Sequence, residues 1–234
     1  MFRLIRELFR GESLLDQSFE ETIAILVVAK GMMSAAARSL RESDRGEVDM
    51  DVHKADIQIN KYQREIRRNI LTHLSVSHAT DLTAALVLTS IIIDVERLGD
   101  YTKNIVELAQ AHPRRLEAGM YEEDVRRLEE RVRAGYDDVR NAIDESDAEA
   151  ARTFMSSHHE YAVLADQIIE SLIGADDKLD KGSAVTVALY VRYLKRIEAH
   201  LNNIITSVVN PFPRIGYRSK RPPEGDASGA PPTS

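Results

Sequence analysis

IIIDVERLGDYTKNI, residues 91–105, is the stretch of the sequence from which the fold is best predicted. Its apolar residues recur at helical spacing, which predicts a helix with one buried side. Three carboxylates, Asp94, Glu96 and Asp100, interrupt that pattern, and Gly99 stands where a helix-forming residue is expected. An acidic side beside a glycine, on an otherwise apolar helix, indicates a role beyond core packing.

The composition of the chain excludes several classes of protein. Of its 234 residues 43% are apolar, enough for one large domain or two small ones. The net charge is −7, which argues against a nucleic-acid partner, because phosphate backbones bind basic surfaces. The absence of cysteine excludes disulfides and thiolate metal sites. No unbroken apolar run approaches the roughly 20 residues of a membrane span, and no signal peptide is recognisable. A cytoplasmic protein is the prediction.

Helix-breaking residues are scarce in the body of the chain. Six of the seven prolines lie between Pro211 and Pro232, and only Pro113 interrupts the body. The body is therefore predicted to be all-α. We expect six helices, over residues 14–42, 47–74, 79–110, 121–144, 147–173 and 183–209.

Short connections between the expected helices predict that consecutive helices are antiparallel. Residues 111–119 divide them into two groups of three, each predicted to be an antiparallel three-helix bundle. The groups resemble each other: shifted by 99 positions, VERLGDYTKNI lies over LKRIEAHLNNI. We expect tandem repeats at residues 13–110 and 119–210.

Two terminal segments lie outside the expected repeats. Residues 1–12, MFRLIRELFRGE, combine apolar residues with arginine and predict a short packing helix. Contact with a membrane surface is the alternative. Residues 211–234 are rich in proline, glycine, serine and charge, a composition typical of a disordered tail.

A second set of polar residues shares one side of the helix before the opening stretch. Its members, three or four positions apart, are Asp49, His53, Asp56 and Asn60. Two antiparallel helices that each present oxygen atoms in this way can surround a cation, as Glu96 and Asp100 do on the next helix. Carboxylate and amide oxygens suit a hard divalent cation, and a histidine extends the choice to iron, manganese or zinc.

An ordinary charged surface is the alternative interpretation of these acids. Four basic residues nearby would neutralise them: Arg64, Arg67, Arg97 and Lys103. Gly99 has its own alternative, because a missing side chain also permits close approach of a neighbouring helix.

The first repeat resembles a PhoU repeat. VERLGD, at 95–100, is similar to the L-E-R-I-G-D motif of that family, with Asp81-Leu82 upstream. The D-x-x-x-N pattern at Asp56 is similar to the acidic pair on the preceding helix. PhoU proteins contain two tandem three-helix repeats, and the resemblance covers about residues 14–210. The implied metal ligands are Asp56, Asn60, Glu96 and Asp100, with Asp94 at a commonly acidic position; helical phase adds His53.

The resemblance implies regulation and not catalysis. PhoU proteins are cytoplasmic negative regulators of phosphate uptake that act on phosphate transporters and on a sensor histidine kinase for phosphate-starvation genes. Some bind iron, zinc or other metal ions through the acidic motifs. We therefore expect those partners, a homodimer, no catalytic residues, and divalent, iron or zinc ions at the first repeat as the only cofactors.

The second repeat departs from the family pattern. Lys195 and Ala199 stand at the positions that match Glu96 and Asp100. A lysine in place of a ligand would repel a cation, so we predict that the second site is lost. His158 and Ala162 match the acidic pair of the preceding helix.

Three other classes of function remain as alternatives. A metal-dependent helical-bundle enzyme, or a metal-binding protein unrelated to phosphate, would use the same acids. However, the sequence contains no E-x-x-H pair of the kind that di-iron bundles use. It contains no phosphate-binding loop, G-x-S-x-G or H-E-x-x-H motif either. A structural scaffold without a ligand is the third alternative.

Overall fold

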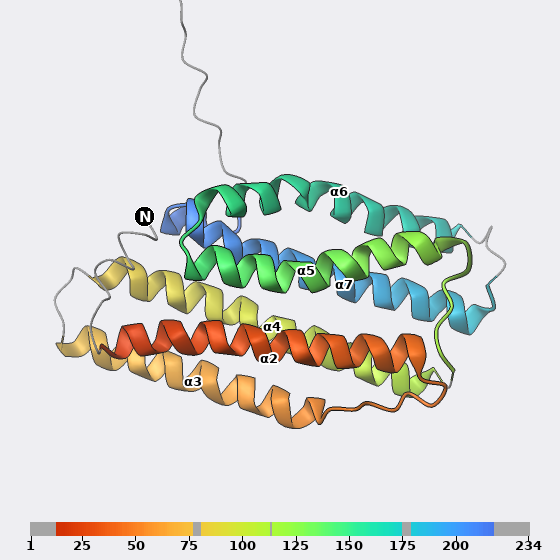
Figure 1. Cartoon of the computed structure of the whole chain (residues 1–234), viewed down its shortest axis with the longest axis horizontal. Coiled ribbons are helices and arrows are strands. Elements are labelled where there is room, and N and C mark those ends of the chain that lie inside the picture. The colour runs from red at the N-terminus through yellow and green to blue at the C-terminus, as the bar shows by residue number, and fades with distance from the viewer. Residues whose placement is uncertain (1–12, 77–80, 113, 175–178, 218–234) are drawn as a thin grey trace, which may run out of the picture.

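The computed structural model describes residues 13–76, 81–112, 114–174 and 179–217 (Figure 1). Within these ranges the chain forms six long helices and no strand, which confirms the all-α prediction. The helices are α2 (Leu14–Glu42), α3 (Val52–Val76), α4 (Leu82–Ala111), α5 (Glu122–Asp144), α6 (Ala148–Ile173) and α7 (Lys181–Val209). Single 3-10 turns, η2 (Gly119–Tyr121) and η3 (Phe212–Arg214), precede α5 and follow α7. The helix predicted for residues 1–12 and the tail from 218 onward lie outside the described residues.

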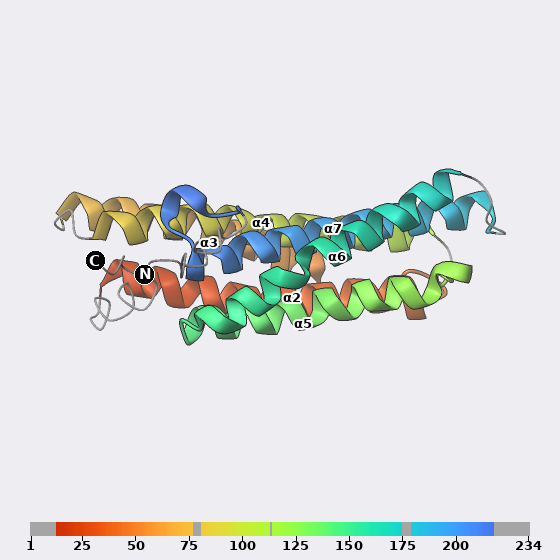
Figure 2. The ribbon, with the colours of Figure 1, turned by 90° about the horizontal axis from the view of Figure 1, so that it is seen from above.

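The six helices form two antiparallel three-helix bundles that lie side by side (Figure 1). Seen from above, α2 and α5 form one layer and α4 and α7 form the other (Figure 2), whereas α3 and α6 lie along the two edges in Figure 1. Each repeat therefore contributes its third helix, α4 or α7, to the layer that joins the two bundles.

Capping residues explain where most helices begin. Ser13 and Asp16 form a capping box at the start of α2. Asp147 accepts two backbone N–H groups at the start of α6. Asp180 does the same for α7, so this helix begins at Lys181, slightly before the predicted start.

The start of α3 differs most from prediction, since it begins at Val52 instead of near Glu47. The preceding loop passes against the end of α4. At Gly46 the backbone has a φ of +63°, and a Cβ there would lie 2.5 Å from the carbonyl oxygen of Ala109. Only glycine fits this turn, and the loop continues to Asp51 before α3 begins.

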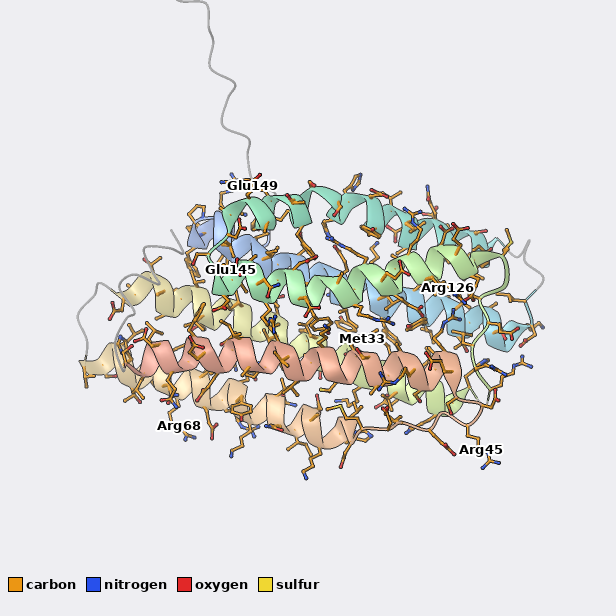
Figure 3. All side chains as sticks on the ribbon, viewed as in Figure 1. Met33, Arg45, Arg68, Arg126, Glu145 and Glu149 are labelled. Atoms are coloured by element: carbon orange, nitrogen blue, oxygen red, sulfur yellow. The ribbon has the colours of Figure 1, made fainter. Side chains whose placement is uncertain are left out.

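One apolar core joins the two repeats. Met33 of α2 is buried and lies between α2 and α5 (Figure 3). Val95 and Leu98 of α4 and Leu194 and Ile197 of α7 are fully buried in the other layer. By length and composition α2 is apolar enough to cross a membrane, although its sequence has no long unbroken apolar run. It packs as a core helix, with 56% of the relevant window buried.

Candidate functional site

The acidic residues of α3 and α4 meet near Gly99 of α4, where side chains of α3 approach the α4 backbone. A Cβ on Gly99 would lie 3.3 Å from Cδ1 of Ile59 and 3.4 Å from Oδ1 of Asp56. The glycine therefore lets α3 approach α4 and places the Asp56 carboxylate against the α4 backbone. Asp56 is only 7% exposed, so this carboxylate needs a partner inside the protein.

Basic residues of α4 supply those partners. Lys103 Nζ lies 3.4 Å from Oδ2 of Asp56 and 3.7 Å from Oδ1 of Asp100. Arg97 reaches Asp100 at 2.9 Å and Glu96 at 3.6 Å. We call this group of five side chains, Asp56, Glu96, Arg97, Asp100 and Lys103, the α3–α4 cluster. Its three carboxylates are bridged by two cations from the same helix.

The electrostatics of the α3–α4 cluster show that its acids are crowded. Burial, and then the negative charge of Asp100, raise the pKa of Glu96, and Arg97 only partly opposes them. Burial opposes the charge of Lys103, but Asp56 and Asp100 outweigh it and raise the pKa of this lysine. Lys103 therefore carries its charge at neutral pH and holds the carboxylates together.

The other three predicted ligands lie at different distances from this cluster. The Asn60 amide donates to Oδ2 of Asp56 at 3.4 Å, so it lies beside the acids. Asp94 points to α7, where His200 Nδ1 lies 2.6 Å and Asn203 Nδ2 lies 3.1 Å from its Oδ1. His53 is exposed on α3. Asp94 thus links the two repeats through α7 and belongs to a different group of contacts.

The α3–α4 cluster, as arranged, fits basic side chains better than a metal ion. Within the described ranges, no group of three or more His, Asp or Glu side chains is placed to hold a metal. Oδ2 of Asp56 already contacts both Asn60 and Lys103, and Asp100 contacts Arg97 and Lys103. A metal at these positions stays a prediction, and it requires both cations to move.

The corresponding region of the second repeat contains ion pairs, of which Arg131–Glu198 is buried. Lys195, which matches Glu96, pairs with Asp166 of α6. Glu198 is 2% exposed and accepts from Arg131 at 3.1 Å and lies 2.6 Å from Nδ1 of His158. The Arg131 guanidinium stacks 3.5 Å from the centre of the Phe154 ring.

Sequence reasoning missed the partners Asp166 and Arg131, because no local motif marks them. Each lies on a different helix from the residue that it neutralises, far away in the sequence. The signal that could have found them is Glu198, which directly follows the buried residue Ile197 in an apolar helix and is itself buried. A buried carboxylate requires a cation or several hydrogen-bond donors.

Comparisons with known proteins match these observations. Residues 23–109 match the PhoU domain, a range that contains α3 and most of α2 and α4. The resemblance noted in the VERLGD motif is thereby confirmed for the first repeat. No curated protein matches the sequence significantly.

Two solved structures share the fold of nearly the whole chain. PhoU from Pseudomonas aeruginosa is 20% identical with a TM-score of 0.75, over 84% of this chain and 95% of that one. The phosphate transport system regulatory protein PhoU from Streptococcus pneumoniae is 20% identical with a TM-score of 0.71, over 89% and 95%. At this identity the likeness establishes the fold of both repeats.

Proposed function

Because this chain carries a PhoU domain at residues 23–109 and has the PhoU fold throughout, we propose that it regulates phosphate transport. The family match across the α3–α4 cluster is the observation that carries the proposal. The similar Streptococcus pneumoniae protein is itself described as a phosphate transport system regulatory protein. We assign this chain no reaction, and its effect comes from binding other proteins.

The proposed partners are a component of a phosphate transporter and the sensor histidine kinase that controls phosphate-starvation genes. Such partners place the protein in the cytoplasm, close to the membrane but not within it. In this proposal the protein works as a homodimer that represses uptake when phosphate is plentiful. Two bundles joined side by side supply long helical faces, which suit contact with other proteins. A small substrate would instead require an enclosed pocket.

The α3–α4 cluster has a modulatory role in this proposal. A divalent cation at Asp56, Glu96 and Asp100 would have to displace Lys103 and Arg97, which now neutralise these carboxylates. Metal binding would therefore release two cationic side chains at the surface of α4. In this proposal a cation bound there would be regulatory, and we assign the cluster no catalytic role.

The proposal is tested by deletion of the gene and measurement of phosphate uptake and phosphate-starvation gene expression. We expect uptake and expression to stay high in phosphate-replete cells that lack the protein, and the intact gene to restore repression. Unchanged uptake and expression at both high and low phosphate would reject the regulatory function.

A further inference from the structure

The outer face of α4 and α7 is a surface that the α3–α4 cluster does not explain. It consists of the solvent-facing side chains in the layer opposite α2 and α5 (Figure 2). Large apolar side chains on this face are 38–59% exposed: Leu82, Leu86 and Ile93 on α4, and Val185 and Leu189 on α7. We call this surface the α4–α7 outer face. Apolar side chains repeated along two neighbouring helices suggest a surface that another molecule covers.

The apolar side chains form two groups, because α4 and α7 are antiparallel neighbours, and we call the diagonal line through both groups the stripe. Those of α4 lie toward its start, and those of α7 lie toward the start of α7, at the opposite end of the molecule (Figure 1). Between them, Arg196 Nε donates to the Tyr101 hydroxyl at 3.1 Å, and the Tyr101 and Tyr193 rings lie 6.2 Å apart. Tyrosine and arginine at the centre of an apolar stripe are typical of protein-binding surfaces.

Both repeats contribute the same elements to this stripe. A shift of 99 positions places Leu86 over Val185 and Arg97 over Arg196. Each third helix thus presents an apolar side chain and, three turns later, an arginine on its solvent side. The first repeat neutralises its arginine internally, since Arg97 pairs with Asp100 and Glu96.

In the second repeat, the two arginines of α7 have no such partners among the described residues. Among the described residues, Arg192 and Arg196 have no carboxylate within ion-pair distance, whereas their neighbour Lys195 pairs with Asp166. Arg192 is exposed, and Arg196 contacts only the Tyr101 ring and hydroxyl. The centre of the stripe therefore carries two positive charges that an acidic partner would satisfy.

We propose that the α4–α7 outer face binds an amphipathic helix of another protein, whose apolar side covers the stripe and whose carboxylates pair with Arg192 and Arg196. An amphipathic helix fits because the stripe is long, narrow and apolar with charges at its centre. This inference rests on the proposed function in one respect, since it supplies the kind of partner through which the regulator acts.

Two other occupants fit the charges less well. A second copy of the chain would bring Glu96 and Asp100, but these acids already hold Arg97 and Lys103. An anionic membrane gains about 1 kcal/mol for each basic residue near its surface, so two arginines give weak binding. Both occupants become outcomes of the test.

The test uses a fluorescein-labelled 20-residue amphipathic peptide with leucine on one side and glutamate along its flanks. Fluorescence anisotropy measures its binding to the full chain at physiological salt. A second peptide with lysine in place of every glutamate is the control for apolar attraction alone. We expect the acidic peptide to bind at least ten times more tightly than the basic one.

Matched charge reversals locate the binding surface. Arg192→Glu combined with Arg196→Glu is expected to weaken the acidic peptide at least ten-fold. Arg64→Glu combined with Arg68→Glu makes the same change at the same spacing on the exposed side of α3, where Arg68 points away from the bundles (Figure 3). This control should leave binding unchanged. Circular dichroism confirms that both variants are folded.

Four results would overturn the proposal. Equal weakening by both variants would show that only general charge attraction holds the peptide. Failure of the acidic peptide to bind would show that the face does not bind such a helix. Light scattering that finds a dimer in the wild type and a monomer in the R192E/R196E variant would assign the face to a second copy. Binding to phosphatidylserine vesicles that this variant loses, without peptide binding, would assign it to a membrane.

The same variant separates this inference from the proposed function. If the gene deletion changes phosphate control but R192E/R196E restores control as fully as the wild type, the regulator stands and the surface proposal fails. If the deletion has no effect on phosphate but peptide binding depends on the two arginines, the surface stands and the regulatory function fails.

Discussion

Gly99 and the acids around it show how single residues explain the opening motif. The glycine lets Asp56 of α3 lie against the α4 backbone, where Lys103 neutralises it. Glu96 is the least satisfied acid of the α3–α4 cluster, since Arg97 lies 3.6 Å from it but 2.9 Å from Asp100. The motif thus combines a packing requirement with a crowded set of charges.

A larger side chain at Gly99 should destabilise the protein. We expect Gly99→Val to lower the free energy of unfolding by about 1–3 kcal/mol, because the branched side chain would collide with Ile59 and Asp56. Gly31→Val, on α2, is the matched control, since a Cβ there meets nothing within 4 Å. Urea denaturation measures both, and equal effects would show that close packing at Gly99 is not required.

Neutralising Glu96 should stabilise the protein at pH 7. Its raised pKa means that the folded state binds a proton more tightly than the unfolded state. Wild-type stability therefore falls as pH rises above the ordinary glutamate value of 4.5. We expect Glu96→Gln to add roughly 0.5 kcal/mol at pH 7, and this gain to disappear below pH 4.5. Urea denaturation at several pH values tests this, and a less stable variant at pH 7 would contradict it.

At the scale of helices, the equivalent helix pairs of the two repeats neutralise their charged side chains with different partners. α3 and α4 bring three acids together and neutralise them with Arg97 and Lys103 from α4. α6 and α7 pair Lys195 with Asp166, and Arg131 of α5 neutralises the buried Glu198. The helical framework is therefore retained, while the charges that line it differ between the repeats.

Removing Lys103 should convert the α3–α4 cluster into a better cation site. The ammonium of Lys103 contacts two of the three carboxylates, so it repels any divalent ion that approaches them. We expect Lys103→Gln to bind Mn²⁺ at least about ten times more tightly than the wild type, measured by isothermal titration calorimetry. Lys195→Gln, at a lysine of similar exposure in the second repeat, should leave Mn²⁺ affinity unchanged. Equal affinities of wild type and K103Q would mean that the lysine does not control the site.

At the scale of the whole molecule, charged contacts near the ends of α2 and α5 join the repeats. Arg41 of α2 pairs with Glu122 and lies 3.0 Å from Glu129, which also accepts from the Tyr190 hydroxyl at 2.8 Å. Asp94 and His200 make a second connection between α4 and α7. Because one core runs beneath these contacts, the bundles are expected to unfold together.

Loss of Glu122 should weaken the connection between the repeats in a pH-dependent way. Burial alone would raise its pKa, but hydrogen bonds from Arg126 and Arg41 lower it from 4.5 to about 2. A lowered pKa contributes stability above pH 4.5 that is lost as pH falls toward 2. We expect Glu122→Gln to cost about 1 kcal/mol at pH 7, after allowance for solvent screening of a partly exposed group.

Urea denaturation at pH 7 and at pH 3 checks this expectation. The difference between wild type and Glu122→Gln should shrink as the pH approaches 3. Glu123→Gln, exposed at the neighbouring position, should change stability by less than about 0.5 kcal/mol at either pH. A pH-independent cost at Glu122 would mean that its contribution is packing and not charge.

The sequence by itself determined the helices and the likeness of the first repeat to PhoU, because helical periodicity and the VERLGD motif are local features. The helix Leu14–Glu42 has the predicted bounds. The start of α3 was predicted too early, since the loop before it packs at Gly46 against the carbonyl of Ala109, far along the chain. The α3–α4 acids were likewise predicted to share a region, since helical phase fixes which side each one faces.

Only the tertiary structure decided which charges neutralise which. Asp94 has its partner His200 106 positions away, and Arg131 and Asp166 lie on different helices from the residues that they satisfy. Such pairings depend on which helices become neighbours, and a single sequence contains no periodic signal for that. The structure also decided that, within the described ranges, Arg192 and Arg196 have no carboxylate partner, because only packing determines which cations of a mixed-charge helix are already paired.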